Sequence, residues 1–192
     1  MEKVLCFIYE DMVDFEMTLA CHLVNKEVIP IAYEIKIIKS NSGMCYYPMA
    51  TVKEALKYTD VAGLIIPGGE NDEQRPELTE LINKLNDQSK LLAAICAGPQ
   101  YLARAGILKG KKYTTELTPD KLKEYFPSVL EDPFPRDTYV NENVVRDNNI
   151  ITAVGNAFVD FSVEVSDYFG NFKDEKEKKA YSSHYKGTNY TG

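Results

Sequence analysis

Cys96 is the residue with the strongest case for chemistry. It follows the apolar run Leu91–Ile95, and the segment Gly98–Ala105, which is rich in small residues, comes almost directly after it. This order predicts a nucleophile elbow, in which a reactive residue stands on a sharp turn between a buried strand and a helix. Free N–H groups at the start of that helix would favour the thiolate and lower the thiol pKa. The alternative is a buried packing cysteine, which is the usual state of a free cysteine.

Two further segments contain candidates for the same chemistry. Pro67–Gly69 ends the apolar run Val61–Ile66, and glycines there allow a backbone N–H to bind an oxyanion; the alternative is a simple turn. Glu16 stands early in a predicted helix that follows the first strand. Beside the Cys96 thiolate its carboxyl group would be partly buried, with a raised pKa, and would donate a hydrogen bond to sulfur or act as general acid or base. Its alternative role is an exposed first-turn acid that stabilises the helix dipole.

The remaining histidines and cysteines indicate no second site. His22 lies within a predicted helix and His184 in a polar segment, so neither supplies an evident local base for the elbow cysteine. Cys6, Cys21 and Cys45 form no CxxC pair, and we interpret them as packing residues rather than ligands or nucleophiles. With two histidines and no metal-ligand spacing, the sequence predicts neither a metal nor a cofactor.

Apolar runs alternate with helical patterns along most of the chain. The expected strands are Val4–Tyr9, Ala32–Ile38, Val61–Ile66, Leu91–Ile95, Thr138–Val145 and Asn149–Ala153. The expected helices follow Asp14, begin near Pro76, Gly98 and Thr118, and include Phe158–Phe169, with a short hairpin expected within 40–48. This alternation predicts an α/β fold with a mostly parallel sheet covered on both faces. Because sites in such sheets lie beyond the carboxyl ends of strands, we expect chemistry near Tyr9, Pro67–Gly69 and Cys96.

Size and charge limit the possible functions. A chain of 192 residues suits one domain, which we expect over residues 1–172, with a polar C-terminal tail over residues 173–192. A net charge of −7 without a basic cluster argues against a nucleic-acid partner. No apolar run approaches the ~20 residues that span a bilayer, and the N-terminus lacks signal-peptide features. We therefore expect a cytoplasmic protein without a membrane partner.

In combination, these segments resemble the DJ-1/PfpI superfamily. The matching pieces occur in family order over most of the chain, and they are Asp14–Glu16, Leu64–Gly69, Ala93–Pro99, Leu102–Leu108 and Gly155–Ala157. The resemblance implies a flavodoxin-like three-layer sandwich, related to class I glutamine amidotransferase domains. It implies Cys96 as nucleophile, Glu16 as its carboxyl partner, and the backbone N–H of Gly69 as an oxyanion donor. It also implies a homodimer. If the protein is an enzyme, we expect the N–H of Ala97 to hold the oxyanion together with that of Gly69.

Two positions depart from the patterns of this family. The PfpI peptidases place a histidine directly after the nucleophile, where this chain has Ala97. The sequence therefore favours the DJ-1-like branch and predicts no useful peptidase activity. DJ-1-like glyoxalases often have a histidine near the match to Thr114–Thr115, and here Glu116 and Leu117 follow instead.

Three functions remain open. The first is an enzyme in which Cys96 attacks a small electrophile, a reactive carbonyl compound or an amide, as a glyoxalase, deglycase or amidase would. The second is a non-catalytic oxidative-stress sensor in which Cys96 oxidises to a sulfinate beside Glu16. The third is a dimeric chaperone or binding module without chemistry of its own.

Overall fold

Seven strands form the central sheet of the structure, a computed structural model that describes residues 2–188. The strands are β1 (Lys3–Phe7), β2 (Glu27–Ala32), β5 (Ala50–Thr51), β6 (Val61–Ile66), β7 (Leu91–Ile95), β8 (Val144–Asp147) and β9 (Ile150–Ala153). Their order across the sheet is β5-β2-β1-β6-β7-β9-β8, and every neighbouring pair is parallel except β8 with β9. The predicted mostly parallel sheet is confirmed.

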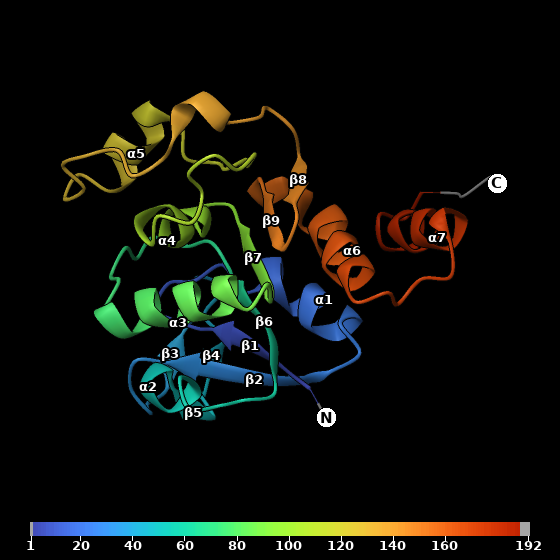
Figure 1. Cartoon of the computed structure of the whole chain (residues 1–192), viewed down its shortest axis with the longest axis horizontal. Helices are drawn as coiled ribbons and strands as arrows, with labels where there is room; N and C mark the ends of the chain where they lie inside the picture. Colours follow the sequence, from blue (N-terminus) through green and yellow to red (C-terminus); the bar gives the residue numbers. More distant parts are fainter. Residues whose placement is uncertain (1, 189–192) are drawn as a thin grey trace.

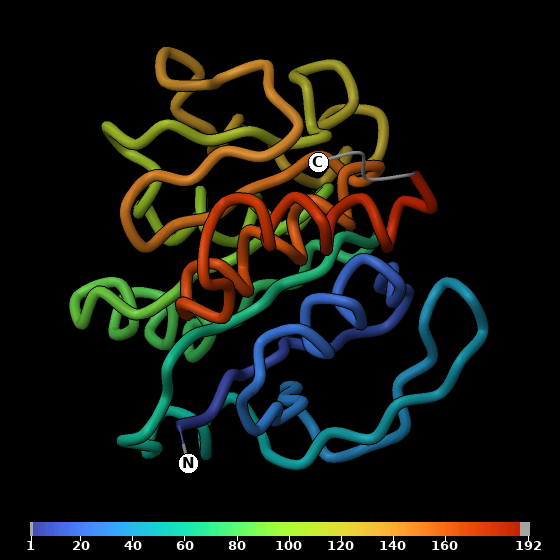
Figure 2. The backbone as a smooth tube through the Cα atoms, turned by 90° about the vertical axis from the view of Figure 1, so that its right-hand side faces the viewer, coloured from blue at the N-terminus to red at the C-terminus, as the bar shows by residue number. Residues whose placement is uncertain are grey.

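Helices cover both faces of this sheet (Figure 1). The helices are α1 (Phe15–Leu23), α2 (Val52–Ala55), α3 (Pro76–Asp87), α4 (Pro99–Arg104), α5 (Pro119–Tyr125), α6 (Phe158–Tyr168) and α7 (Glu175–Tyr185). On one face α1 packs against α6, and on the other face α3 packs against α2 and α4. The α7 helix lies outside α6, as its red trace shows in Figure 2. The molecule is therefore the three-layer α/β sandwich that the sequence predicts.

Local sequence accounts for the elements that carry the core. All residues of β6 and β7 are buried, as expected for strands covered on both faces. In α3, Pro76 occupies the first turn, where a backbone N–H has no hydrogen-bond partner within the helix, so the N–H that proline lacks is not needed. The apolar residues of α3 recur at helical spacing and are all buried, and they are Leu78, Leu81, Ile82 and Leu85. The ends of these elements therefore follow from the sequence.

Two predicted strands lie at the wrong residues. The second strand is β2 at Glu27–Ala32, instead of Ala32–Ile38. Proline is disfavoured within a strand because it has no N–H to donate to a neighbouring strand. Pro30 is tolerated in β2 because the pairing of β2 with β5 involves Ile31 and Ala32 and does not include Pro30. The segments after β2 form a short hairpin, β3 (Ile38–Lys39) with β4 (Cys45–Tyr46), whose first strand precedes the expected range 40–48.

The second displaced strand belongs to the antiparallel pair at the sheet edge. It was expected at Thr138–Val145, and the structure has β8 at Val144–Asp147. Asp147 pairs with Ile150, so the turn between the strands is Asn148–Asn149, with Asn148 in the left-handed region at φ 56°. The position of this turn fixes the register of β8.

The polar tail expected over residues 173–192 contains the helix α7, which the sequence analysis did not predict. This helix has no buried residue, so it lacks the apolar stripe that reveals a helix in a sequence. Lys178 of α7 instead pairs with Glu164 at 2.7 Å and Asp167 at 3.1 Å, both on α6. Residues 189–192 of the tail lie outside the described residues. Among residues 2–188, no helix is both long and apolar enough to cross a bilayer.

Candidate active site

Cys96 has a strained backbone that is held from both sides. It stands between β7 and α4 with φ 61°, a left-handed conformation that non-glycine residues rarely adopt. Its N–H donates to the carbonyl of Ala153 at 2.8 Å. Its carbonyl accepts from the N–H of Glu116 at 3.0 Å and from the hydroxyl of Thr115 at 2.9 Å. These bonds hold the predicted elbow, because strain of this kind persists only where the surroundings enforce it.

The residues after Cys96 let the chain turn directly into α4. A Cβ at Gly98 would lie 2.7 Å from the carbonyl oxygen of Ile66 and 2.8 Å from that of Pro67. Only glycine fits against these backbone atoms. Pro99 then begins α4, where proline is favoured. The glycine at position 98 is therefore required by the close approach of the end of β6.

Glu16 is buried in the first turn of α1, with 2% of its surface exposed. Its Oε2 accepts a hydrogen bond from the N–H of Gly68 at 2.8 Å. Burial raises the pKa of Glu16 to about 7, although the hydrogen bonds from Gly68 and Cys96 act in the opposite direction. The predicted raised pKa agrees with this result, and the alternative of an exposed first-turn acid does not.

Glu16 and Cys96 lie together, as the resemblance implied. A Cβ at Gly155 would lie 2.8 Å from Oε1 of Glu16 and 3.1 Å from Sγ of Cys96. Burial raises the pKa of the Cys96 thiol well above its ordinary value, and the Glu16 carboxylate raises it further, whereas a hydrogen bond from the N–H of Ala97 lowers it. The lowered pKa expected from the helix start is therefore wrong. The six-residue helix α4 does not outweigh desolvation and a neighbouring carboxylate.

A cavity of about 280 Å³ opens beside Cys96. Gly69 and Ala97, the predicted oxyanion donors, both line it. Its apolar lining residues are Val13, Leu117, Tyr125 and Phe126. Cys96 is partly exposed in this wall, so it is not a cysteine that serves packing alone.

Gly69 is fixed in the cavity wall by the loop that follows β1. A Cβ at Gly69 would lie 2.8 Å from the carbonyl oxygen of Asp11 and 2.8 Å from Cα of Met12. The N–H of Val13 donates to the carbonyl of Gly68 at 2.8 Å. The loops after β1 and β6 therefore touch, as the rule about carboxyl strand ends predicts.

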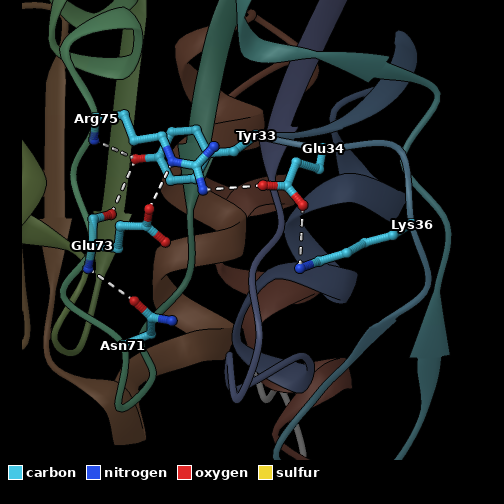
Figure 3. A network of polar contacts seen from close by, with 6 residues as sticks. All are labelled: Tyr33, Glu34, Lys36, Asn71, Glu73 and Arg75. Atoms are coloured by element: carbon cyan, nitrogen blue, oxygen red, sulfur yellow. Dashed lines mark hydrogen bonds and ion pairs between the residues drawn. The ribbon is translucent and has the colours of Figure 1, made fainter.

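The loop after β6 is also tied to the end of β2 (Figure 3). The hydroxyl of Tyr33 accepts from the N–H of Arg75 at 3.0 Å and donates to the carbonyl of Glu73 at 3.0 Å. The Arg75 guanidinium stacks 4.6 Å from the centre of the Tyr33 ring and pairs with the carboxylates of Glu73 and Glu34. These contacts surround a smaller cavity of about 60 Å³ and hold the loop in which Gly69 lies.

The other histidines and cysteines lie away from the cavity wall. His22 of α1 and His184 of α7 are exposed, and neither lines the cavity. Cys6 is buried in β1, with its thiol 3.0 Å from the sulfur of Met17, as expected of a packing residue. Cys45 is exposed on β4, so the packing interpretation is wrong for this residue.

Sequence reasoning missed part of the cavity. Glu116, which precedes α5, and Lys121 of α5 line it, and their side chains form an ion pair. The helix was predicted from Thr118–Pro119, but no sequence signal placed it over the elbow. In the sequence, Gly155 stands out only through the resemblance of Gly155–Ala157 to the family. Its position just beyond the carboxyl end of β9 is the signal that indicates the site.

Comparison with known proteins identifies the family of this chain. The DJ-1/PfpI family model matches residues 2–167. The chain belongs to the DJ-1/PfpI family. A relative of uncharacterized function from Methanocaldococcus jannaschii is 35% identical over 98 residues, which cover 49% of this chain and 44% of that protein. Protein DJ-1alpha of Drosophila melanogaster is 25% identical over 177 residues, 85% of this chain and 76% of that protein. For the first three curated relatives, the match covers between 26% and 56% of their lengths.

Solved structures of this family share the fold. A DJ-1 superfamily protein from Agrobacterium tumefaciens superposes with a TM-score of 0.78 at 24% identity, covering 96% of this chain and all of that chain. An oxidized DJ-1 from Toxoplasma gondii superposes with a TM-score of 0.75 at 24% identity, covering 99% of this chain and all of that chain. At this identity the likeness concerns the fold alone, and it confirms the α/β architecture predicted for the DJ-1/PfpI family.

Proposed function

We propose that this protein is a cysteine-dependent enzyme that acts on a small electrophile, a reactive carbonyl compound or an amide. The observation that carries the proposal is the position of Cys96. Its backbone is held at φ 61°, its sulfur adjoins the buried Glu16 carboxyl, and it lines a cavity of about 280 Å³. Strained conformation, a titratable partner and an accessible cavity occur together at catalytic nucleophiles.

The chemistry begins with addition of the Cys96 sulfur to the carbonyl carbon. A C–S bond forms while the carbonyl π electrons move to oxygen, and the thiol proton passes by way of Glu16 to that oxygen. The N–H groups of Gly69 and Ala97 donate to the developing oxyanion. With an aldehyde that carries a neighbouring carbonyl group, this step gives a hemithioacetal bound to Cys96. Proton transfer by way of Glu16 from its C–H carbon to the neighbouring carbon gives a thioester, which water hydrolyses to a hydroxy acid and free Cys96. With an amide, the proton on the adduct oxygen passes by way of Glu16 to the nitrogen, and the amine leaves as the carbonyl re-forms in a thioester. Water then hydrolyses the thioester to the acid and free Cys96. A Glu16 pKa of about 7 suits proton transfer in both directions near neutral pH.

Relatives with assigned names support an enzyme without fixing its substrate. Deglycase PfpI of Pyrococcus furiosus is 29% identical over 124 residues, and an isonitrile hydratase of Pseudomonas putida is 28% identical over 152 residues. These two names describe different activities. We therefore limit the proposal to the class of electrophile that a cysteine attacks.

A substrate panel tests this proposal. The purified protein is incubated with methylglyoxal, glutamine and simple amides, and products are followed by NMR. We expect turnover of at least one compound that Cys96→Ala abolishes and that the matched replacement of the exposed Cys45→Ala leaves unchanged. Turnover that survives in Cys96→Ala, or none with any carbonyl compound or amide, would contradict the proposal.

A second function, oxidative-stress sensing, is favoured by the hydrogen-bonding groups at the sulfur. Two molecules of peroxide convert the thiol to a sulfinate and release two molecules of water. The N–H of Ala97 and the protonated form of Glu16 then donate to the new oxygens, and such charge-assisted bonds contribute roughly 1.5–3 kcal/mol each. A peroxide titration with peptide mass spectrometry tests this function. We expect Cys96 to gain two oxygen atoms and stop there in wild type, and to retain the sulfinate poorly in Glu16→Leu. Equal behaviour of both proteins would contradict the sensor.

A further inference from the structure

Few charged side chains line the cavity beside Cys96, and negative charges outnumber positive ones. Among its lining residues within 2–188, the charged ones are Glu70, Glu116 and Lys121. The ammonium of Lys121 pairs with the carboxylate of Glu116, and the two side chains are 40% and 37% exposed. Glu70 is exposed and follows Gly69 in the wall. An incoming molecule therefore meets a net negative charge, and the cation that it meets is already paired.

Glu116 has a fixed place relative to the reacting sulfur. Its N–H donates to the carbonyl of Cys96 at 3.0 Å, and the hydroxyl of the preceding Thr115 donates to the same oxygen at 2.9 Å. Burial is the main cause of the raised pKa of Cys96 and of Glu16, and the Glu116 charge raises both further. The hydrogen bond to Glu116 is the main cause of the raised pKa of Lys121. Glu116 therefore lies close enough to Cys96 and Glu16 for its charge to act on both groups.

Resting on the function proposed above, we propose that Glu116 and Lys121, together with Glu70, select the substrate of Cys96 by charge. The site takes neutral or cationic carbonyl compounds and rejects those with a carboxylate or phosphate next to the carbonyl. An anion entering the cavity is repelled by Glu70 and Glu116, and to use Lys121 it must first displace the carboxylate of Glu116. At separations of several ångströms near a protein surface, one unit charge changes an encounter rate on the order of fivefold.

The opposite arrangement would make Lys121 an anion receptor. Lysine binds carboxylates and phosphates well when its ammonium is free. Here the Lys121 ammonium is paired with Glu116. Removal of the Glu116 charge should therefore reduce the preference for cationic compounds and favour anionic ones. Variants that alter these charges should therefore shift the preference of Cys96 between cationic and anionic reagents in opposite directions.

Three methanethiosulfonate reagents, one cationic, one neutral and one anionic, provide the test. Each transfers its thioalkyl group to the cysteine sulfur and releases methanesulfinate, and the rate at Cys96 is followed by peptide mass spectrometry. We expect wild type to favour the cationic over the anionic reagent on the order of fivefold. Lys121→Gln should increase this ratio, and Glu116→Gln should decrease it to about one or below. The double variant restores the net charge and should return the ratio to the wild-type value.

Controls separate cavity charge from general surface charge. Lys123→Gln and Glu124→Gln alter exposed residues of α5 that do not line the cavity, so neither should change the ratio. High salt should reduce the wild-type ratio towards one, because it screens these half-exposed charges.

The ratio of the reaction rates of the charged reagents at Cys96 does not depend on whether the protein turns over a substrate. If no substrate is turned over while the ratios follow the expected order, the enzymatic proposal fails and the charge selectivity of the cavity remains. If the cationic and anionic reagents react equally in wild type, or if neither Glu116→Gln nor Lys121→Gln changes the ratio, the selectivity proposal is overturned. A wild-type preference for the anionic reagent overturns it as well and assigns Lys121 as an anion receptor.

Discussion

Glu16 and Cys96 border the same two glycines, and neither glycine leaves room for a methyl group. A Cβ at Gly68 would lie 2.7 Å from Oε2 of Glu16 and 2.9 Å from Sγ of Cys96. The corresponding distances at Gly155 are 2.8 Å from Oε1 and 3.1 Å from Sγ. The backbone of two separate loops therefore sets the spacing of the carboxyl group and the thiol.

Gly155→Ala should disturb this pair. The added methyl group displaces Glu16 or Cys96, and overpacking of this kind costs about 1–3 kcal/mol of unfolding free energy. We expect lower stability in urea and a changed alkylation rate at Cys96. Asn156→Ala, at the exposed neighbouring position, should change neither. A Gly155→Ala variant with wild-type stability and reactivity would show that the two side chains are not in contact with this glycine.

Glu16→Gln should make Cys96 more reactive while it impairs the enzyme. The variant removes a negative charge that raises the pKa of the Cys96 thiol, so the thiolate forms at lower pH. The midpoint of the alkylation rate against pH, measured with iodoacetamide, should fall. Turnover should also fall, because glutamine cannot carry the proton. If the midpoint stays in place or rises, the carboxylate does not act on the sulfur.

Glu16 should also make stability depend on pH. Its pKa is about 7 in the folded protein and 4.5 without the fold, so the folded state binds this proton more tightly. The contribution is therefore complete below pH 4.5 and is lost as the pH rises through about 7. As the pH rises between these limits, the free energy of unfolding of wild type should fall by up to about 3 kcal/mol relative to that of Glu16→Gln, as measured by urea unfolding. Glu80→Gln, which alters an exposed glutamate of α3, should show no such trend. If the difference in unfolding free energy between wild type and Glu16→Gln does not change with pH, the pKa of Glu16 is not raised.

Peptidase activity should be absent. The residue after the nucleophile is Ala97, and neither His22 nor His184 lines the cavity, so the histidine base of the peptidase pattern is missing. We expect no casein or peptide cleavage above that of Cys96→Ala. Efficient cleavage that depends on Cys96 would mean that Glu16 or Glu116 replaces that base.

The protein should form a homodimer, an expectation that rests on family membership. Light scattering at micromolar concentration should give about twice the chain mass of 21.7 kDa. A mass near that of one chain at every concentration would rule the dimer out.

The sequence by itself determined the elements that follow local rules. Buried β6 and β7, the stripe of α3 and the turn around Cys96 were predicted at or within a residue or two of their observed ends. Apolar periodicity, proline and glycine act on neighbouring residues, so one sequence reveals them. The same signals placed β2 and β8 wrongly, because their positions depend on which strands they pair with.

Tertiary structure alone decided the electrostatics of the site and the shape of the tail. The thiol pKa of Cys96 rises because folding buries it beside Glu16 of helix α1, 80 residues earlier in the sequence, and no local pattern contains that contact. Glu116 and Lys121 enter the cavity for the same reason. Helix α7 carries no apolar stripe, and Lys178 finds its carboxylate partners only after α6 has packed. Charge interactions depend on distance in space, and the sequence records only distance along the chain.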